Sequence, residues 1–351
     1  MNIGRRINDA RRFVMHRVAE GIGKTNLPKG AISSTDVKRV LISRPNHRLG
    51  NQLLLTPLIQ ELADRFPGCK IDLFVKGHAG PIIFQNYTAV DRIMKLERKP
   101  FNHLFNYLKG WTQLQRSSYD LVINVVHNSS SGRIAAQFAR GRFKLFCEED
   151  PAILNEHPDA VHMAKYPVYY LRKYLPAIVQ EQQPVPRVDL KLSKDELQLG
   201  AAKLHEIVPN SKKSISIFTF ATGDKMLGTE WWDKFYDKLV EAFPLHNIVE
   251  VLPVENVSQL NFRAPSYYSK DIREISAFIA NTEVFIGADS GMMHLASASL
   301  SPTLGLFAVT KSDVYAPYGG GSRAVNIEQT SIDELIQMIR GLIKHGDKSG
   351  D

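Results

Sequence analysis

The sequence has little of what marks several large classes of protein. It contains only two cysteines, Cys69 and Cys147. That excludes a disulfide scaffold and a cysteine-rich zinc site, and it is typical of a protein kept in a reducing compartment. No stretch approaches the ~20 apolar residues that a membrane-spanning helix needs, and the N-terminus lacks the apolar core of a signal peptide. We therefore expect a cytoplasmic protein.

Two common nucleotide-binding motifs are also missing. The chain has no GxxxxGK[ST] sequence and no GxGxxG after its first expected strand, which argues against a P-loop and an NAD-type Rossmann domain. It has no helix-turn-helix, RNP or zinc-finger motif, so we expect no nucleic-acid partner. The net charge of +8 instead suggests an acidic lipid surface or a phosphorylated substrate.

What is present is the pattern of an α/β protein. The chain has 351 residues, 44% hydrophobic and 23% charged, which suits a soluble protein of two domains. Short β-rich runs alternate with helical stretches, as in parallel sheets built from βαβ units. Strands are expected at 38–43, 70–75, 90–96, 119–126, 214–220, 247–252, 283–287 and 303–309, and helices at 52–66, 102–115, 131–140, 229–243, 271–281, from about 292, and at 331–344.

Three segments follow from this pattern. The polar, proline-containing stretch 180–192 is expected to be a linker between an N-terminal domain, 35–182, and a C-terminal domain, 183–345. Residues 1–34 form an N-terminal extension, where apolar residues recur at helical spacing and arginines lie mostly off that stripe. Such a basic amphipathic helix can lie on an anionic membrane. It can equally pack on its own domain or form a mobile extension.

The C-terminal half contains the most suggestive loop. The strand 283–287 leads into Asp289, Ser290 and Gly291, and a helix is expected from about Met292. Ser290 or Asp289 can cap this helix, and its first N–H groups then suit a phosphate. The alternative is an ordinary cap without a ligand.

Two further loops follow strands, and ligands of such folds bind beyond the carboxyl ends of strands. After the strand 214–220 come Thr222 and Lys225, a hydroxyl and an ammonium that suit phosphate oxygens, although a solvated loop lysine is the alternative. After the first strand, the turn 46–51 contains His47, Arg48 and Gly50.

Two motifs together resemble a known family. The stretch RLGNQLLLTPLIQELADRFPGCKIDLFV resembles the opening iGDxllttPlirelkrrfPdaeIdvlv of the ADP-heptose:lipopolysaccharide heptosyltransferases, glycosyltransferase family 9. The stretch VFIGADSGMMHLASASLSPTLGLFAVTKSDVYAPYG resembles that family's vvgnDSGpmHlAaalgtPtvalfGpTdp..w.PyG. The resemblance extends over about residues 37–330, with both motifs in the right order and spacing.

The resemblance implies a GT-B fold, in which two Rossmann-like domains face each other across a cleft. The N-terminal domain is then expected to bind the acceptor and the C-terminal domain the nucleotide-sugar. The implied reaction is an inverting, metal-independent transfer of heptose, or a related sugar, from an ADP-sugar to a lipopolysaccharide-core-type glycolipid. No DxD metal triad follows a strand, and no cofactor beyond the co-substrate is expected. Contact with the inner face of the anionic cytoplasmic membrane would suit such an acceptor.

The resemblance also assigns site residues by position. Acceptor binding is expected near an arginine- and lysine-rich face that includes Arg44 and Lys76, with ligand-free surface arginines as the alternative. His294 either contacts the donor or is a structural histidine under the loop. The residues expected to bind the donor are Thr222, Lys225, Glu255, Asp289, Ser290, Gly291, Met292 and His294, and those expected to bind the acceptor are Arg48, Gly50, Asn51, His127 and Arg133.

One position departs from the family pattern. The family's proposed base is the aspartate of its GD motif, and this chain has Asn51 there. An amide oxygen accepts a hydrogen bond but does not take up a proton. The expected catalytic residues are Asn51, Lys225, Asp289 and His47.

Three explanations of Asn51 are open. His47, His78 or His127 can supply the base. A phosphate oxygen of the donor or water can take the proton while Asn51 orients the hydroxyl. Alternatively, the chain is a non-catalytic nucleotide-sugar or glycan-binding protein. We expect an active enzyme, because the donor-side residues are intact.

Overall fold

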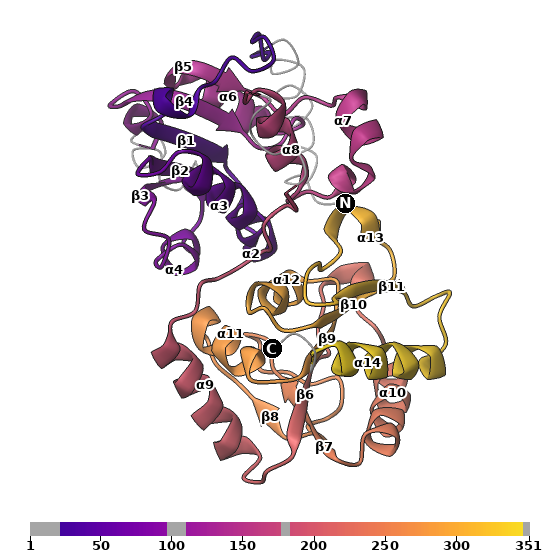
Figure 1. The fold of residues 1–351 in the computed structure, drawn as a ribbon. Helices are drawn as coiled ribbons and strands as arrows, with labels where there is room; N and C mark the ends of the chain where they lie inside the picture. Colours follow the sequence, from indigo (N-terminus) through magenta and orange to yellow (C-terminus); the bar gives the residue numbers. More distant parts are fainter. Residues whose placement is uncertain (1–21, 97–109, 177–182, 347–351) are drawn as a thin grey trace, which may run out of the picture. The chain divides into compact units, whose positions relative to one another are not determined.

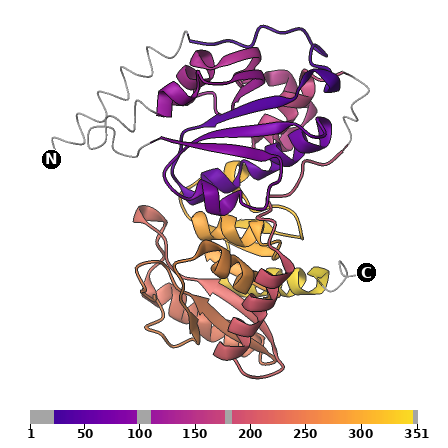
Figure 2. The same ribbon diagram turned by 90° about the vertical axis from the view of Figure 1, so that its left-hand side faces the viewer.

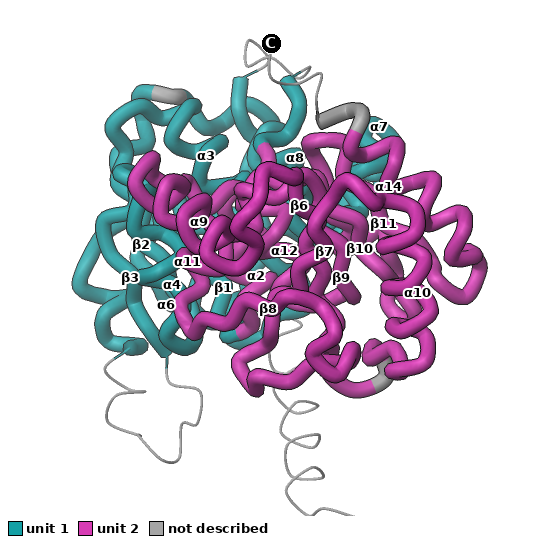
Figure 3. The backbone as a smooth tube through the Cα atoms, turned by 90° about the horizontal axis from the view of Figure 1, so that it is seen from below, with its two compact units in different colours: residues 1–47, 57–186 teal, residues 48–56, 187–351 magenta. Residues whose placement is uncertain are grey.

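The computed structural model describes residues 22–96, 110–176 and 183–346. Most of the predicted extension and most of the predicted helix 102–115 lie outside the described residues. Contacts between residues divide the chain into two compact units, which Figure 3 shows in different colours. Unit 1 consists of residues 1–47 and 57–186, and unit 2 of residues 48–56 and 187–351.

Unit 1 is built on a five-stranded parallel sheet with the order β3-β2-β1-β4-β5 (Figure 1). Its strands are β1 (Arg39–Arg44), β2 (Lys70–Lys76), β3 (Val90–Leu96), β4 (Ser118–Asn124) and β5 (Arg140–Leu145). Its α-helices among the described residues include α3 (Thr56–Arg65, of which Thr56 belongs to unit 2), α4 (Gly80–Ile83), α6 (Ser130–Phe138), α7 (Pro151–Glu156) and α8 (Tyr166–Lys173). Two short 3₁₀ helices are η1 (Ser34–Asp36) and η3 (Pro158–Val161).

The central strands of unit 1 are buried on both faces. Val40, Leu41 and Ile42 of β1 all have 0% exposure, because helices cover both sides of a parallel sheet. One face packs around Phe74, whose ring meets that of Trp111 edge-to-face at 5.7 Å. The continuous apolar runs that predicted these strands are therefore explained by two-sided burial.

Unit 2 has a six-stranded parallel sheet with the order β11-β10-β9-β6-β7-β8, and Figure 2 shows its strands in a second view. Its strands are β6 (Lys213–Phe218), β7 (His246–Val251), β8 (Ser266–Tyr267), β9 (Val284–Ala288), β10 (Thr303–Phe307) and β11 (Arg323–Asn326). Its helices include α2 (Leu49–Leu53), α9 (Lys194–Ile207), η4 (Gly223–Lys225), α10 (Thr229–Ala242), α11 (Ile272–Ala280), α12 (Gly291–Ala298), α13 (Ser312–Tyr315) and α14 (Ile332–Gly346).

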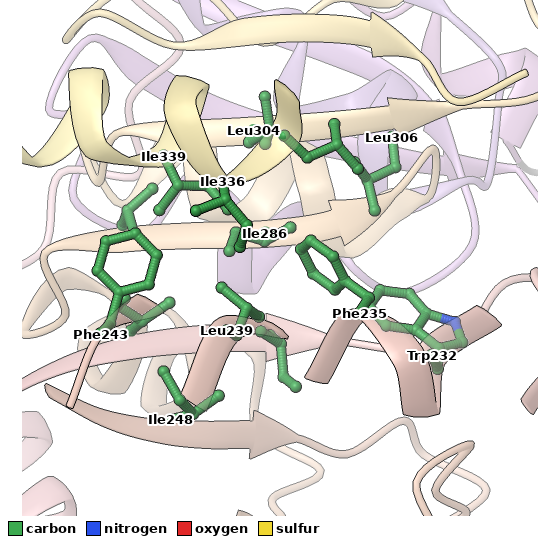
Figure 4. Packing of buried hydrophobic residues seen from close by; sticks show 14 of the residues in the cluster. Trp232, Phe235, Leu239, Phe243, Ile248, Ile286, Leu304, Leu306, Ile336 and Ile339 are labelled. Atoms are coloured by element: carbon green, nitrogen blue, oxygen red, sulfur yellow. The ribbon is translucent and has the colours of Figure 1, made fainter. Parts of the chain in front are cut away.

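One apolar cluster holds α10 and α14 against the unit 2 sheet (Figure 4). From α10 come Trp232, Phe235 and Leu239, which recur at helical spacing and have 0% exposure. They meet Ile286 of β9 and Ile339 of α14. Burying each such side chain contributes about 1.5–3 kcal/mol, so the aromatic-rich helix predicted at 229–243 is fixed in place by its apolar face.

The α/β class with two Rossmann-like domains is confirmed, and most predicted elements are present within two or three residues of their expected ends. The predicted linker has no helix or strand in its described part, 183–192. Elements that were not predicted include β5, α7, α8 and α9. Their sequences are short or irregular in apolar period, so tertiary contacts rather than local pattern decide them.

The helix predicted at 52–66 is instead two helices, α2 and α3. The chain turns at Leu54 and Leu55, and the Thr56 hydroxyl donates to the Leu53 carbonyl oxygen at 2.8 Å while accepting from the Asp189 N–H at 3.1 Å. The break sets α2 apart from α3, and contacts group residues 48–56 with unit 2. The division therefore differs from the expected domains, 35–182 and 183–345, both at this segment and by a few residues at the linker.

Candidate active site

The two predicted phosphate-binding loops flank one point of the unit 2 sheet. From β6 the chain proceeds through β7 to β8 at one edge, and from β9 through β10 to β11 at the other. The strand order therefore reverses between β6 and β9, and ligands of open α/β sheets bind beyond the carboxyl ends of strands at such a point. Thr222 and Lys225 follow β6, and Asp289 and Ser290 follow β9. Residues 64 positions apart are thus brought to one place, as the sequence predicted.

An ion pair joins these two loops. The Lys225 ammonium donates to Asp289 Oδ2 at 2.5 Å. The Asp289 side chain is 7% exposed and that of Lys225 is 36% exposed. The Asp289 N–H also donates to the Leu306 carbonyl oxygen of β10, so the carboxylate is held by the sheet. The partly exposed Lys225 ammonium is therefore held at the switch point by its ion pair with the buried Asp289 carboxylate.

The start of α12 lies directly after Asp289. Ser290 is the N-cap, because its Oγ accepts from the Met292 N–H at 3.2 Å. Of the two predicted caps, Ser290 is therefore correct. The Met292 N–H, which we expected to bind the donor, is occupied by this cap. The first-turn amides of a helix have no carbonyl partner within the helix, so those of Gly291 and Met293 are better placed for an anion.

Helix α2 packs closely on α12 through Gly50. A Cβ atom at Gly50 would lie 2.4 Å from Cδ2 of His294, and one at Gly291 would lie 3.3 Å from the Leu49 Cβ. The His294 side chain is buried, and its ring meets that of Tyr315 edge-to-face at 6.2 Å. His294 therefore supports the turn as a packed histidine, which was one of the two predicted alternatives. This packing holds α2, which also contains the half-buried Asn51, against α12.

The unit 1 sheet has its own switch point between β1 and β4. His47 follows β1 and is exposed, while His127 follows β4 and is half-buried. Ser129 caps α6 by accepting from the Gly132 N–H. Arg48, the residue before α2, is exposed and makes no side-chain cap. Among the other predicted positions of this region, Arg44 is buried, Lys76 is half-buried and His78 is exposed.

Arg133 differs from its expected role as a surface arginine that binds an anionic acceptor. Arg133 is buried, with 4% exposure. Its guanidinium donates to the carbonyl oxygens of Ile22 and Gly23 at 3.0 and 2.7 Å. Its Nη1 lies 3.0 Å from His127 Nδ1. These contacts use three of the five guanidinium donors. We therefore place Arg133 in the support of the site and not in direct contact with an acceptor.

The predicted ribose-binding acid Glu255 is exposed in the loop after β7. A different acid, Glu250 of β7, has 0% exposure and accepts from the Thr219 hydroxyl at 2.5 Å and the Ser258 hydroxyl at 2.6 Å. Burial raises the pKa of Glu250, and the two hydrogen bonds oppose that rise. Glu250 ties the end of β6 to the loop that contains Glu255. Its position inside the strand stretch NIVEVL is the only sequence signal for it, and a single acid in a predicted strand does not by itself indicate this network.

Two absences among the described residues concern metal binding and membrane crossing. Across residues 22–96, 110–176 and 183–346, no group of three or more histidine, cysteine or acidic side chains is arranged to hold a metal ion. Within the same residues, no helix is long and apolar enough to cross a membrane.

Sequence comparisons identify relatives for this fold and site. The model of glycosyltransferase family 9 (heptosyltransferase) matches residues 270–337, which include the Asp289 loop. The chain is 22% identical over 336 residues to lipooligosaccharide heptosyltransferase 2 of Haemophilus influenzae, a match that covers 89% of this chain and 92% of the relative.

Solved structures are similar over both units. The family 9 glycosyltransferase of Veillonella parvula has a TM-score of 0.68 at 14% identity and covers 88% of this chain and 98% of its own. The ADP-heptose lps heptosyltransferase II of E. coli gives 0.63 at 14% identity, with 88% and 99% covered. E. coli heptosyltransferase WaaC, solved with ADP-2-deoxy-2-fluoro heptose, gives 0.61 at 16% identity, with 86% and 99% covered.

These solved structures establish the fold, and the two sequence matches establish the kinship that the motifs predicted. The matched family segment contains the loop that holds Asp289 at the switch point. The predicted resemblance to glycosyltransferase family 9 (heptosyltransferase) is thus confirmed, and the comparisons support a glycosyltransferase that is similar to these enzymes.

Proposed function

We propose that this protein transfers heptose, or a related sugar, from an ADP-sugar to a lipopolysaccharide-core-type glycolipid, with inversion and without a metal ion. Two observations support the choice of substrates. The similar E. coli structures are described as an ADP-heptose enzyme and as a complex with an ADP-heptose analogue. The Haemophilus relative is named for lipooligosaccharide. The proposal assigns the donor to unit 2 and the acceptor to unit 1.

The observation that carries the proposal is the Lys225–Asp289 pair at the switch point of unit 2. In the reaction, an acceptor oxygen forms a bond to the anomeric carbon while the bond from that carbon to the diphosphate oxygen breaks. The electron pair of the broken bond leaves with ADP. Lys225 and the first-turn amides of α12 offset this charge, and one preorganised donor of this kind contributes about 3 kcal/mol to such a barrier.

The residues around the pair have distinct roles in this proposal. Asp289 orients the Lys225 ammonium and accepts a hydrogen bond from a donor-sugar hydroxyl, because a carboxylate would repel the diphosphate itself. The exposed hydroxyl residue Thr222, together with the Ser290–Gly291 turn, contacts the phosphates. Glu255 accepts from the ribose hydroxyls, and the Glu250 network fixes the loop from which it projects.

The proton of the acceptor hydroxyl has two routes in this proposal. Asn51 orients the hydroxyl through its amide oxygen, and the proton passes either to the exposed His47 or to a donor phosphate oxygen and then to water. A His47→Ala variant separates these routes. Loss of the ascending limb of the pH–rate profile identifies His47 as the base, whereas an unchanged profile assigns the proton to the phosphate and water.

The first test is calorimetric titration with ADP, UDP, GDP and CMP, followed by hydrolysis and transfer assays with ADP-heptose. We expect selective binding of ADP. Lys225→Met should weaken ADP binding at least tenfold and lower turnover about 10²–10³-fold. Lys203→Met on α9 is the matched control, because Lys203 is similarly exposed (41%) and also has an acidic partner, Glu206.

The outcomes are distinct. Equal effects of Lys225→Met and Lys203→Met would remove Lys225 from the phosphate site. Selective binding of another nucleotide would overturn the donor and keep the fold. ADP binding without hydrolysis or transfer would favour the non-catalytic binding protein that Asn51 motivates. Addition of EDTA tests the metal-free mechanism, which predicts unchanged turnover.

A further inference from the structure

The segment 22–25 is fastened to unit 1 beside the carboxyl ends of β4 and β5. Arg133 of α6, the helix after β4, donates to the carbonyl oxygens of Ile22 and Gly23. The Thr25 N–H and hydroxyl both donate to the carboxylate of Glu148 at 2.8 Å, and the Thr25 hydroxyl oxygen accepts from the Phe146 N–H at 2.9 Å. Glu148 and Phe146 follow β5. We refer to residues 22–25 as the strap.

The strap is shaped for its place. Gly23 has φ of +70°, and a Cβ atom there would lie 2.1 Å from Cε1 of the Phe146 ring. Only glycine satisfies both conditions. The strap is therefore fixed by Arg133 on one side and by Glu148 on the other, so the guanidinium is held in one position.

This position determines the state of His127. Arg133 Nη1 lies 3.0 Å from His127 Nδ1. A guanidinium only donates hydrogen bonds, so Nδ1 must be the acceptor and carries no proton. The proton of the neutral ring is then on Nε2. His127 is therefore a hydrogen-bond donor through Nε2, and its other nitrogen is already occupied.

We propose that His127 is an acceptor-binding residue that donates from Nε2–H to an anionic oxygen of the glycolipid acceptor, and that Arg133 and the strap are positioning groups which lock its tautomer. The proposal rests on the proposed function, because it assigns the acceptor to unit 1. His127 lies three residues after the end of β4, at the switch point where a ligand of the unit 1 sheet is expected. The locked tautomer also removes His127 from the candidates for the base. Its Nδ1 already accepts from Arg133 and its Nε2 already carries a proton, so neither nitrogen is available to take up the acceptor's proton.

Histidine-selective ¹⁵N labelling of the full-length protein tests the lock without any substrate. The His127 signals are assigned by their loss in His127→Gln. We expect a bare Nδ1 and a protonated Nε2 in the wild-type protein, because Arg133 donates to Nδ1. In Arg133→Met, part of the protein should instead carry the ring proton on Nδ1, because no guanidinium then donates to that nitrogen. A protonated Nδ1 in the wild-type protein, or an Arg133→Met spectrum equal to that of the wild type, would overturn the lock.

Paired substitutions test the contact with the acceptor. The amide nitrogen of glutamine reaches about as far as Nε2, and that of asparagine only as far as Nδ1. The test is a transfer assay with ADP-heptose and a truncated lipopolysaccharide that lacks heptose. His127→Asn should raise the acceptor KM at least tenfold, whereas the acceptor KM of His127→Gln should stay close to that of the wild type. A hydrogen bond to a charged group has this magnitude. The affinity for ADP should not change in either variant.

The two proposals fail in different ways. Equal acceptor KM values for the wild type, His127→Gln and His127→Asn would overturn the contact while turnover itself upholds the proposed function. No turnover by the wild-type protein with truncated lipopolysaccharide would count against the proposed function and, with it, the acceptor contact. The labelling experiment decides the tautomer lock in either case.

Discussion

Asn51 is the residue at which this chain departs from the family 9 pattern that it resembles, and its position suits a role in the proposed reaction. It is half-buried in α2, next to Gly50, where α2 packs on the start of α12. An aspartate there would accept the hydrogen bond that we propose Asn51 accepts from the acceptor hydroxyl, and it would also take the proton. We expect Asn51→Asp to raise the transfer rate at least tenfold, within the usual range for a general base.

The control for this substitution is Asn51→Ala. It should lower the rate, because the hydroxyl is no longer oriented. A rate for Asn51→Asp below that of Asn51→Ala would contradict the prediction. It would mean that the reaction needs the amide N–H₂ of Asn51 as a donor and that the base lies elsewhere.

Gly50 allows a second prediction at the residue scale. A methyl group there would meet the buried His294 ring. Gly50→Ala should therefore destabilise the protein by about 1–3 kcal/mol, the usual cost of overpacking, and should lower turnover by displacing Asn51. Urea unfolding monitored by tryptophan fluorescence measures the first effect.

The double variant Gly50→Ala with His294→Ala distinguishes a clash from a loss of backbone flexibility. Removing the ring makes room for the methyl group, so the two changes should be less damaging together than the sum of the single effects. Strict additivity would show that α2 does not pack on His294.

Residues that follow strands were predictable, and their partners were not. The sequence places Thr222, Lys225 and Asp289 at the ends of strands, and parallel topology then brings them together. The hydrogen bonds between Arg133 and the strap join residues 110 or more positions apart. No local pattern indicates such a pairing, so Arg133 was assigned to the surface.

Among the elements, α9 was not predicted, although the sequence contains the signal for its start. Ser193 and Glu196 form a capping box at its start, a signature that is visible in the sequence. The helix was missed because few of its residues are buried, and so it lacks a continuous apolar stripe. Its partner is not local, because Glu196 also pairs with the buried Arg273 of α11.

This pair gives a prediction about acid stability. The hydrogen bond from Arg273 is the main cause that lowers the pKa of Glu196 to about 2, from 4.5. Because the folded state holds the carboxylate ionised, the pair stabilises the protein above pH 4.5, and this contribution is lost as the pH falls toward 2. Glu196→Gln should lower the free energy of unfolding by about 2 kcal/mol at pH 7.

Urea unfolding at several pH values measures this difference. The difference in the free energy of unfolding between the wild type and Glu196→Gln should decrease steadily below pH 4.5. The matched control is Glu206→Gln at the other end of α9, where the acid is 63% exposed and pairs only with Lys203 among the contacts described. That variant should stay within about 0.5 kcal/mol of the wild type. If this difference in the free energy of unfolding did not depend on pH, the charge of Glu196 would not contribute to stability.

For the whole molecule, length and alternation were enough to predict two α/β domains, because each parallel sheet needs its own covering helices. The assignment of residues 48–56 was beyond reach. It depends on the break between α2 and α3 and on the packing of Gly50 against His294. A single boundary in the sequence cannot describe residues 48–56, because the residues on both sides of them belong to unit 1 while they pack on a helix of unit 2.

The last prediction concerns the charge of the whole chain, which is +8, and the proposed contact with an anionic membrane. Residues 1–21 contain five arginines and two acidic residues, and each basic residue near such a surface contributes about 1 kcal/mol. A chain that begins at Ile22 keeps the strap and its contacts with Arg133 and Glu148, so we expect it to fold normally. It should bind vesicles rich in phosphatidylserine at least tenfold more weakly than the full chain.

Two controls make this experiment decisive. Neutral phosphatidylcholine vesicles should bind neither protein, and added salt should reduce the binding of the full chain because screening weakens surface charge interactions. Equal binding of both chains to anionic vesicles would place the membrane contact on the folded units. A contact that depends on residues 1–21 would instead reach the membrane from the strap, at the edge of unit 1 where His127 is proposed to hold the acceptor.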